Sequence, residues 1–217
     1  MEVLVIGAHG KIGKLVTQKM QRAVDFDVTA FIRKEEQKGY FNELGVKSIV
    51  GDLEASVEEI AEKLKGFDTI VFTAGSGGKT GDDKTLEIDL DGAVKTMLAA
   101  QKNAIKRYVM VSAAYADDRS KWKATGLKPY YVAKHFADLE LKRSNLDYTI
   151  IRPVSLTDDN GKGLITLTKS PENLQKEIAR ADVAEVILES LRNKKSIKEV
   201  IEISEGNDSI KEAIAGI

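Results

Sequence analysis

The segment Val3-Leu4-Val5-Ile6-Gly7-Ala8-His9-Gly10-Lys11-Ile12-Gly13 passes directly from four β-favouring apolar residues into three glycines with the spacing G-x-x-G-x-x-G. A helical pattern of apolar residues follows it. A strand, a tight glycine turn and a helix in this order form an anion-binding site, because the first N–H groups of the helix point outward and its dipole favours negative charge there. Glycines also occur in ordinary turns, but their place between a strand and a helix favours a phosphate-binding loop.

Each glycine of this loop has its own expected task. Gly7 lets the chain turn, Gly10 lets a pyrophosphate approach the backbone, and Gly13 lets the helix pack closely. His9 is placed either to reach a phosphate or to lie exposed in the loop. The predicted phosphate-binding residues are therefore Gly7, Ala8, His9, Gly10, Lys11, Ile12 and Gly13.

Composition narrows the classes of function. The 33 basic and 34 acidic residues give a net charge of -1, which argues against a general nucleic-acid-binding protein. No apolar run approaches about 18 residues, so we expect no membrane span. Cysteine is absent, which excludes thiol catalysis, and His9 and His135 are too few to indicate a zinc site. Because the first strand begins at once, leaving no room for a signal peptide, we expect a cytoplasmic protein without a metal.

Strand and helix patterns alternate along the whole chain. The strand patterns are continuous apolar runs, which is typical of a parallel sheet covered on both faces. The sequence therefore predicts an α/β, doubly wound, mostly parallel sheet with helices on both faces, the NAD(P)-binding Rossmann fold. We expect a single domain over 1–217, with a small substrate-side region at about 154–217. The expected strands are 3–6, 26–32, 46–50, 68–74, 107–112, 147–153, 164–167 and 199–203, and the later helices are 35–44, 56–64, 84–103, 130–143, 182–191 and 208–214.

Arg33 and Lys34 follow the second expected strand, where the adenosine ribose of a dinucleotide lies. An acid at this place favours NAD, whereas an arginine accommodates the 2′-phosphate of NADP. Since no acid occurs before Glu35, the sequence favours NADP over NAD. The alternative for Arg33 is a solvated basic residue at the start of a helix.

Residues after the third and fourth strands complete the expected cofactor groove. Asp52, with Leu53 beside it, is placed to meet the adenine edge, and Asp52 is also a good helix N-cap. The run Thr73-Ala74-Gly75 supplies small residues on which a cofactor can lie flat.

Tyr130 and Lys134 form a Y-x-x-x-K pair on one face of an expected helix, just after the fifth strand. A lysine cation near a phenol favours the phenolate, so we expect Lys134 to lower the tyrosine pKa from about 10. Such a tyrosine can pass a proton to a carbonyl oxygen as hydride arrives. Ser112 ends the fifth strand, deep in the same cleft, and is the third candidate catalytic residue.

Together these residues resemble the short-chain dehydrogenase/reductase superfamily, and more closely its atypical NAD(P)H-binding branch with the biliverdin reductase B-like and NmrA-like proteins. The likeness covers nearly the whole chain. The motifs that carry it are Gly7 to Gly13, Gly51-Asp52-Leu53, Tyr108-Val109-Met110-Val111-Ser112-Ala113, Tyr130 to Lys134, Leu146 to Pro153, Ala181-Asp182-Val183-Ala184 and Ile201-Glu202-Ile203-Ser204.

The resemblance implies a role for each matching position. It implies that Gly7, Gly10 and Gly13 hold the pyrophosphate. It further implies that Arg33 lies near the 2′-phosphate, Asp52 near adenine, Lys134 on the nicotinamide ribose, and Pro153 with Val154 against the nicotinamide, with Tyr130 as acid/base. Val111 and Lys34 complete the expected cofactor contacts.

One departure from the family pattern leaves several functions open. In the extended members the catalytic hydroxyl stands two residues after the first serine of the run, and here that residue is Ala114. The leading hypothesis is an NADP(H)-dependent oxidoreductase acting on a small carbonyl, quinone or flavin-like substrate, as a monomer or homodimer. The alternatives are an NADPH-binding sensor with little or no catalysis and an NAD-dependent epimerase or dehydratase, which the short C-terminal region disfavours.

Three further stretches carry weaker expectations. Gly78-Lys79-Thr80 suggests a nucleotide-binding P-loop, but Thr73 stands where that motif needs its first glycine. The stretch 115–128 reads as a polar loop in which Trp122 either lines the pocket or makes a partner contact. Gly161 and Gly163 suggest a mobile lid over 158–164.

Overall fold

The first strand, β1 (Glu2–Ile6), lies inside the sheet and is buried on both faces. The computed structural model describes residues 1–78 and 80–217, without the side chain of residue 124. Val3 and Val5 pack into the core on one face of the sheet, and Leu4 and Ile6 pack into the core on the other. This strict alternation explains why the strand has no polar position between residues 3 and 6.

The main sheet is doubly wound around β1, as the sequence predicts. Its strand order is β11-β8-β10-β6-β5-β4-β1-β2-β3. The chain adds β2 and β3 on one side of β1 and then crosses to the other side to add β4, β5 and β6. Neighbours from β3 through β10 are parallel, whereas β8 pairs antiparallel with β10 and β11. The other strands are β2 (Asp27–Ile32), β3 (Lys47–Val50), β4 (Thr69–Phe72), β5 (Arg107–Val111), β6 (Asp147–Pro153), β8 (Leu164–Thr168), β10 (Glu199–Glu205) and β11 (Asp208–Ser209), and a separate parallel pair joins β7 (Ser155–Thr157) to β9 (Glu177–Ala179).

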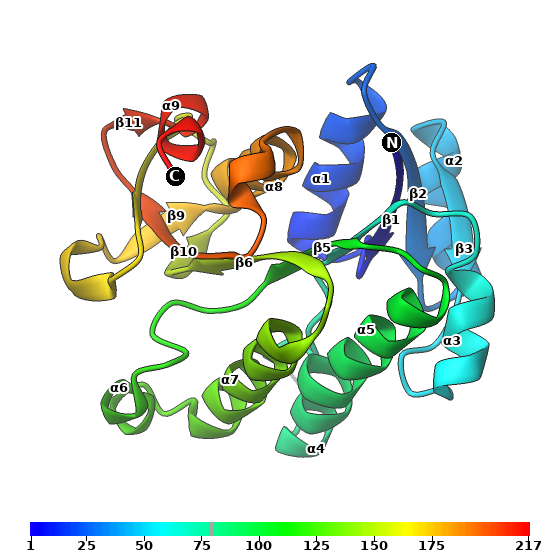
Figure 1. The fold of residues 1–217 in the computed structure, drawn as a ribbon, viewed down its shortest axis with the longest axis horizontal. Coiled ribbons are helices and arrows are strands. Elements are labelled where there is room, and N and C mark those ends of the chain that lie inside the picture. Colours follow the sequence, from blue (N-terminus) through cyan, green and yellow to red (C-terminus); the bar gives the residue numbers. More distant parts are fainter. Residues whose placement is uncertain (79) are drawn as a thin grey trace.

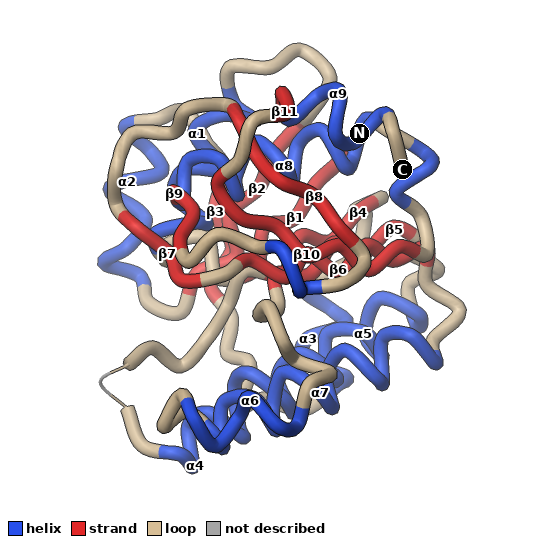
Figure 2. Tube along the Cα trace, turned by 90° about the vertical axis from the view of Figure 1, so that its left-hand side faces the viewer, coloured by secondary structure: helices blue, strands red, loops and turns tan. Residues whose placement is uncertain are grey.

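Helices cover both faces of the sheet (Figures 1 and 2). One layer contains α1 (Lys11–Gln21), α2 (Lys38–Glu43), α8 (Arg180–Arg192) and α9 (Ile210–Ala215). The opposite layer contains α3 (Val57–Lys63), α5 (Ala93–Lys102) and α7 (Lys128–Arg143). The shorter segments are η1 (Glu35–Gln37), α4 (Asp82–Lys84), the π-helical η2 (Thr85–Gly92), α6 (Arg119–Ala124), η3 (Pro171–Asn173) and η4 (Lys194–Ser196). The Rossmann fold class predicted from the sequence is confirmed.

The stretch 115–128 differs from its prediction as a polar loop. It contains α6, which begins after the N-cap Asp118, whose carboxylate accepts the N–H of Ser120. Trp122 is 3% exposed, its Nε1 donates to the carbonyl oxygen of Tyr115 at 3.2 Å, and its ring lies 5.4 Å from that of His135. Trp122 therefore anchors α6 onto α7, and at 3% exposure it is not available for the partner contact that was one of its two expected roles.

Two glycines of the first turn have no room for a side chain. Gly7 has φ +80, and a Cβ on it would lie 2.5 Å from the backbone nitrogen of Ala74. A Cβ on Gly13 would lie 2.4 Å from the carbonyl oxygen of Gly7 and 2.6 Å from the Cα of Ala8. The turn is thus packed backbone to backbone against both α1 and the chain after β4.

None of the helices formed by the described residues has the length and apolar character needed to cross a bilayer.

Substitution of Gly13 by alanine is expected to destabilise the protein. The added methyl group would meet backbone atoms that cannot move independently, and overpacking of this kind costs about 1–3 kcal/mol. Gly39→Ala is the matched control, because Gly39 lies in α2 with no atom within 4 Å of its Cβ position, and should stabilise by up to about 1 kcal/mol. Urea unfolding of both variants measures the difference, and equal stabilities would contradict the packing described for the turn.

Candidate cofactor and active site

A long groove follows the carboxyl ends of the strands, where ligands of doubly wound sheets bind. It consists of two cavities of about 320 Å³ and about 610 Å³. Both cavities are lined by the segment after β4, which makes them continuous. The shared residues are Thr73, Ala74, Gly75, Ser76 and Thr80.

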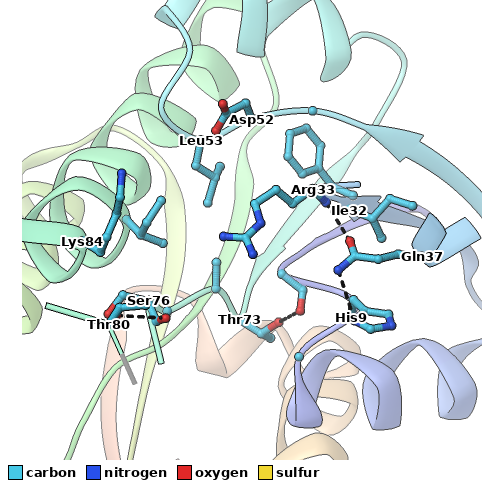
Figure 3. A pocket seen from close by; sticks show the side chains of 17 residues that line it. His9, Ile32, Arg33, Gln37, Asp52, Leu53, Thr73, Ser76, Thr80 and Lys84 are labelled. Atoms are coloured by element: carbon cyan, nitrogen blue, oxygen red, sulfur yellow. Dashed lines mark hydrogen bonds between the residues drawn. The ribbon is translucent and has the colours of Figure 1, made fainter. Parts of the chain in front are cut away.

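The first cavity contains the positions predicted to bind the adenosine half of a cofactor (Figure 3). Gly7, His9 and Gly10 come from the turn after β1, and Asp52 with Leu53 comes from the turn after β3. Arg33, after β2, directs its guanidinium group into the space between Leu53 and Thr73 (Figure 3). Lys34 does not line this cavity, and its ammonium group pairs with Glu36 at 3.5 Å.

Gln37 connects the turn after β2 to the glycine turn. Its Oε1 accepts the backbone N–H groups of Arg33 and Lys34 at 3.0 and 3.2 Å, so its Nε2 faces His9 Nδ1 at 3.2 Å. His9 Nδ1 therefore accepts, and the neutral imidazole carries its proton on Nε2. Burial, helped by the charge of Lys14, lowers the pKa of His9, which keeps the ring neutral at pH 7.

Asp52 has a local role besides its place in the cavity wall. Its Oδ1 accepts the N–H of Glu54 at 2.9 Å, which closes a tight turn after β3. The N-cap of α3 is Ser56, whose hydroxyl accepts the N–H of Glu59 in a capping box. The alternative that Asp52 caps this helix is therefore wrong.

The second cavity brings together the predicted catalytic residues. Ser112 follows β5, whereas Tyr130 and Lys134 project from α7. Lys11, Ile12 and Val111 also line it. The remaining predicted contacts, Ala8, Gly13, Pro153 and Val154, are buried and line neither cavity.

Lys134 forms a buried ion pair that the sequence analysis did not anticipate. Its Nζ lies 3.1 Å from Oδ1 of Asp89 in η2, and the two side chains are 6% and 2% exposed. Burial lowers the pKa of Lys134, but the charge and hydrogen bond of Asp89, together with the charges of Tyr130 and Asp138, outweigh it, so that the pKa is raised. Asp89 Oδ2 also accepts the N–H of Ser76 at 2.8 Å, which fixes the segment between the two cavities. The sequence signal for Asp89 was an acid inside a helical stretch, which alone does not distinguish a buried position from an exposed one.

The same pair changes the expectation for Tyr130. Burial raises the pKa of Tyr130, and Asp89 raises it further, so the lowering by Lys134 is outweighed. The Lys134 Nζ stands 5.6 Å from the centre of the Tyr130 ring. Lys134 does lower this pKa, but the predicted net lowering from about 10 is wrong. The phenol stays protonated at neutral pH, in the form that can donate.

Ser112 offers a second hydroxyl group in the cavity. It is 3% exposed, and within residues 1–78 and 80–217 its Oγ makes no hydrogen bond of good geometry, although it lies close enough to the Asp138 carboxylate to lower the pKa of that group. A buried hydroxyl that is incompletely hydrogen-bonded is costly in free energy, which is typical of a group that meets a ligand. Ala114, the other position considered for a catalytic hydroxyl, is 2% exposed and its N–H donates to Pro153.

Behind the cavity, a buried arginine holds α7 in place. Arg152 on β6 donates from Nε to Asp138 on α7 at 2.9 Å, and its Nη1 lies 3.3 Å from Glu202 on β10. Asp138 is one turn beyond Lys134 on the same helix. The ion pairs therefore tie the helix that carries Tyr130 to two strands of the sheet.

No group of three or more histidine, aspartate or glutamate side chains in the described part of the chain is arranged to hold a metal ion. The P-loop hypothesis depended on Lys79, which lies outside the described residues. The neighbouring Thr80 uses its hydroxyl to donate to the carbonyl oxygens of Ser76 and Gly77.

The residues along the groove match the chemical groups of a dinucleotide in its middle and at both ends. Its middle is bare backbone at Gly7, Gly10 and Gly75, so a bulky pyrophosphate can approach. A cation stands at one end, at Arg33, and hydroxyl groups stand at the other, at Ser112 and Tyr130.

Comparisons with known proteins agree with this geometry. A family model described as NAD(P)H-binding matches residues 7–194. The chain is 46% identical to the "Uncharacterized sugar epimerase YhfK" of Bacillus subtilis over 99% of both chains. A putative NAD-dependent epimerase/dehydratase from Bacillus halodurans superposes with a TM-score of 0.93 at 36% identity over all of both chains, and an oxidoreductase from Lactococcus lactis with 0.89 at 37% identity over 100% of this chain and 96% of that one.

More distant structures share the fold alone. A short-chain dehydrogenase/reductase from Veillonella parvula in complex with NADP gives a TM-score of 0.77 at 19% identity, each chain being covered to 97%. An anaerobilin reductase from Escherichia coli O157:H7 gives 0.80 at 23% identity, with 94% of this chain and 97% of that one covered.

Replacing Asp89 by asparagine is expected to reduce the free energy of unfolding by about 3 kcal/mol or more, because it leaves the Lys134 charge buried without its partner. Asp91→Asn is the matched control on the same helical segment, since Asp91 is 61% exposed in its pair with Lys95 and should cost less than about 1 kcal/mol. Denaturant unfolding compares the two. Adding Lys134→Met to Asp89→Asn should restore stability, and a double variant less stable than Asp89→Asn would contradict this account.

Proposed function

This chain belongs to the NAD(P)H-binding family, and from that premise we propose that it is an NADPH-dependent oxidoreductase that reduces a small carbonyl, quinone or flavin-like substrate. The observation that carries the proposal is the second cavity, which is lined by both the protonated phenol of Tyr130 and the incompletely hydrogen-bonded hydroxyl of Ser112. The NAD(P)H bound by this family can act as the reductant, and the Tyr130 hydroxyl in this cavity can act as the proton donor.

The preference for NADPH rests on Arg33. Its guanidinium group enters the first cavity beside the adenosine positions (Figure 3), where a 2′-phosphate would meet it. Lys84, which also lines this cavity, is already engaged by Glu54 and Glu87. Arg33 is therefore the residue we assign to the 2′-phosphate.

The proposed chemistry assigns one task to each side chain. When bound, the cofactor supplies a hydride. Ser112 Oγ–H donates a hydrogen bond to the substrate carbonyl oxygen, which polarises the carbonyl carbon. As the hydride reaches that carbon and the C=O π electrons move to oxygen, the Tyr130 hydroxyl gives its proton to the oxygen.

Lys134 supports the resulting phenolate and holds the cofactor ribose. Its charge is balanced by Asp89 beforehand, so the site is neutral before the reaction and carries one negative charge on Tyr130 after proton transfer. A proton from solvent returns to Tyr130 and completes the cycle. The residues after about 154 would form the substrate side of the same domain.

A sugar-nucleotide epimerase or dehydratase is the second candidate. It is favoured by the names of the Bacillus subtilis relative and the Bacillus halodurans structure, both of which contain the word epimerase. Such an enzyme would use NAD and retain it, whereas the position of Arg33 favours NADPH. A sensor that binds NADPH without turnover is the remaining alternative, and the cofactor and Tyr130 experiments separate the three.

Arg33→Ala is expected to weaken NADPH binding about ten- to a hundredfold, because a charge-assisted hydrogen bond contributes about 1.5–3 kcal/mol. NADH affinity should change less than twofold, since NADH has no 2′-phosphate. Lys34→Ala is the control, because Lys34 lies outside the cavity. Titration followed by nicotinamide fluorescence gives the dissociation constants, and wild-type protein that prefers NADH would favour the epimerase.

Tyr130→Phe should lower the rate of carbonyl reduction at least a hundredfold while NADPH affinity stays within twofold, because general acid catalysis contributes about 10²–10⁴. Tyr131→Phe, one residue out of register with Lys134, is the control. Because the pKa of Tyr130 is raised, the wild-type rate should show no loss from its ionisation below about pH 10. Undetectable wild-type turnover on aldehydes and quinones, with tight NADPH binding, would favour the sensor.

A further inference from the structure

Two cations on the wall of the second cavity share one carboxylate. Lys11 is the first residue of α1 and Arg180 is the first residue of α8, and both line the cavity. The Asp158 carboxylate lies between them, with Oδ2 on Lys11 Nζ and Oδ1 at 2.6 Å from Arg180 Nη1. Asp158 itself does not line the cavity.

A cation at the first residue of a helix is electrostatically unfavourable when no anion lies near it. The dipole places partial positive charge at a helix N-terminus, where a lysine or arginine is repelled. A negative group between the two cations offsets this repulsion, and Asp158 supplies it. The hydrogen bond from Lys11 and the charge of Arg180 lower the pKa of Asp158.

Asp158 is placed so that another anion can replace it. The Asp158 side chain is 61% exposed, so its carboxylate can move away from the two cations into solvent without entering the protein interior. The chain beyond it is fixed separately, because the N–H groups of Lys162 and Gly163 donate to Asp182 at 3.1 and 2.9 Å. The predicted lid over 158–164 stays a prediction, but residues 162 and 163 are held on α8 and Asp158 can turn away without releasing them.

The rest of the cavity defines what such an anion would be attached to. Its wall is apolar at several positions, and the buried charges of Lys134 and Asp89 neutralise each other. Asp82, which is exposed at the start of α4, is a further acid on the wall. The apolar lining residues are Ile12, Val111, Leu127, Pro129, Tyr130 and Leu156.

We propose that Arg180, together with Lys11, binds an anionic group of the substrate in place of Asp158, so that the preferred substrate is an apolar carbonyl compound or quinone that carries a carboxylate, sulfonate or phosphate. This substrate class rests on the reductase function proposed above. The cofactor pyrophosphate has the same chemistry, and the experiment is designed to tell the two anions apart.

The test compares 4-carboxybenzaldehyde with its neutral analogue 4-formylbenzamide, at saturating NADPH. The wild-type KM should be at least tenfold lower for the carboxylate, Arg180→Gln should remove this difference, and Asp158→Asn should lower the KM for the carboxylate further. Lys162→Gln is the control, because Lys162 lies in the same segment and pairs with Glu205. The pair 1,2-naphthoquinone-4-sulfonate and 1,2-naphthoquinone repeats the comparison for quinones.

Two results would overturn the proposal. One is a wild-type protein that does not distinguish the charged from the neutral member of either pair. The other is an Arg180→Gln variant whose NADPH dissociation constant rises tenfold while both aldehydes are affected equally, since the cations would then bind the cofactor pyrophosphate.

A binding measurement separates this proposal from the reductase function. Calorimetric titration of the protein–NADP⁺ complex with benzoate and with benzamide requires no turnover. Benzoate binding that Arg180→Gln abolishes, in a protein that reduces no aldehyde or quinone, would retain the anion site and reject the reductase. Aldehyde reduction without benzoate binding would reject the anion site and retain the reductase.

Discussion

The close contact between the turn after β1 and the chain after β4 is the constraint on which the site depends. Gly7 packs against Ala74 at a distance that no side chain would permit, and Gly13 packs against Gly7 in the same way. Because these contacts are between backbones, the carboxyl ends of the two central strands come together with almost no side-chain atoms between them. The groove that results is continuous from Arg33 to Tyr130, and both of its cavities share the segment that begins at Thr73.

The sequence was informative where a backbone requirement determines the residue type. Three glycines between an apolar strand and a helix predicted the turn, and the run from Asp147 to Pro153 predicted β6 to its last residue. Arg33 and Lys34 both fitted the position after β2, but a one-residue step along the chain turns one side chain into the cavity and leaves the other outside it. The sequence predicted both residues as cofactor contacts, and only Arg33 lines the cavity.

The features that the sequence did not indicate depend on burial by distant segments. Trp122 is covered because α6 packs on α7, and a short polar stretch gives no periodic signal of that contact. Asp89 becomes a partner of Lys134 because η2 and α7 lie side by side, about 45 residues apart in the chain by their numbers. The pKa of Tyr130 is raised first by burial and then by this neighbour, and an isolated Y-x-x-x-K spacing contains the lysine but neither the burial nor the aspartate.

The two halves of the groove are built by different means, and this difference bears on how function varies among related chains. The turn that borders the first cavity is shaped by the backbone packing of Gly7 and Gly13, which allows no side chain at either position. Side chains from separate elements line the second cavity, including Leu127 before α7, Leu156 in β7 and Arg180 in α8. Exchange of one of these side chains alters the cavity without disturbing the turn. The glycine turn therefore carries little information about a substrate, which has to be argued from the charged side chains that line the second cavity.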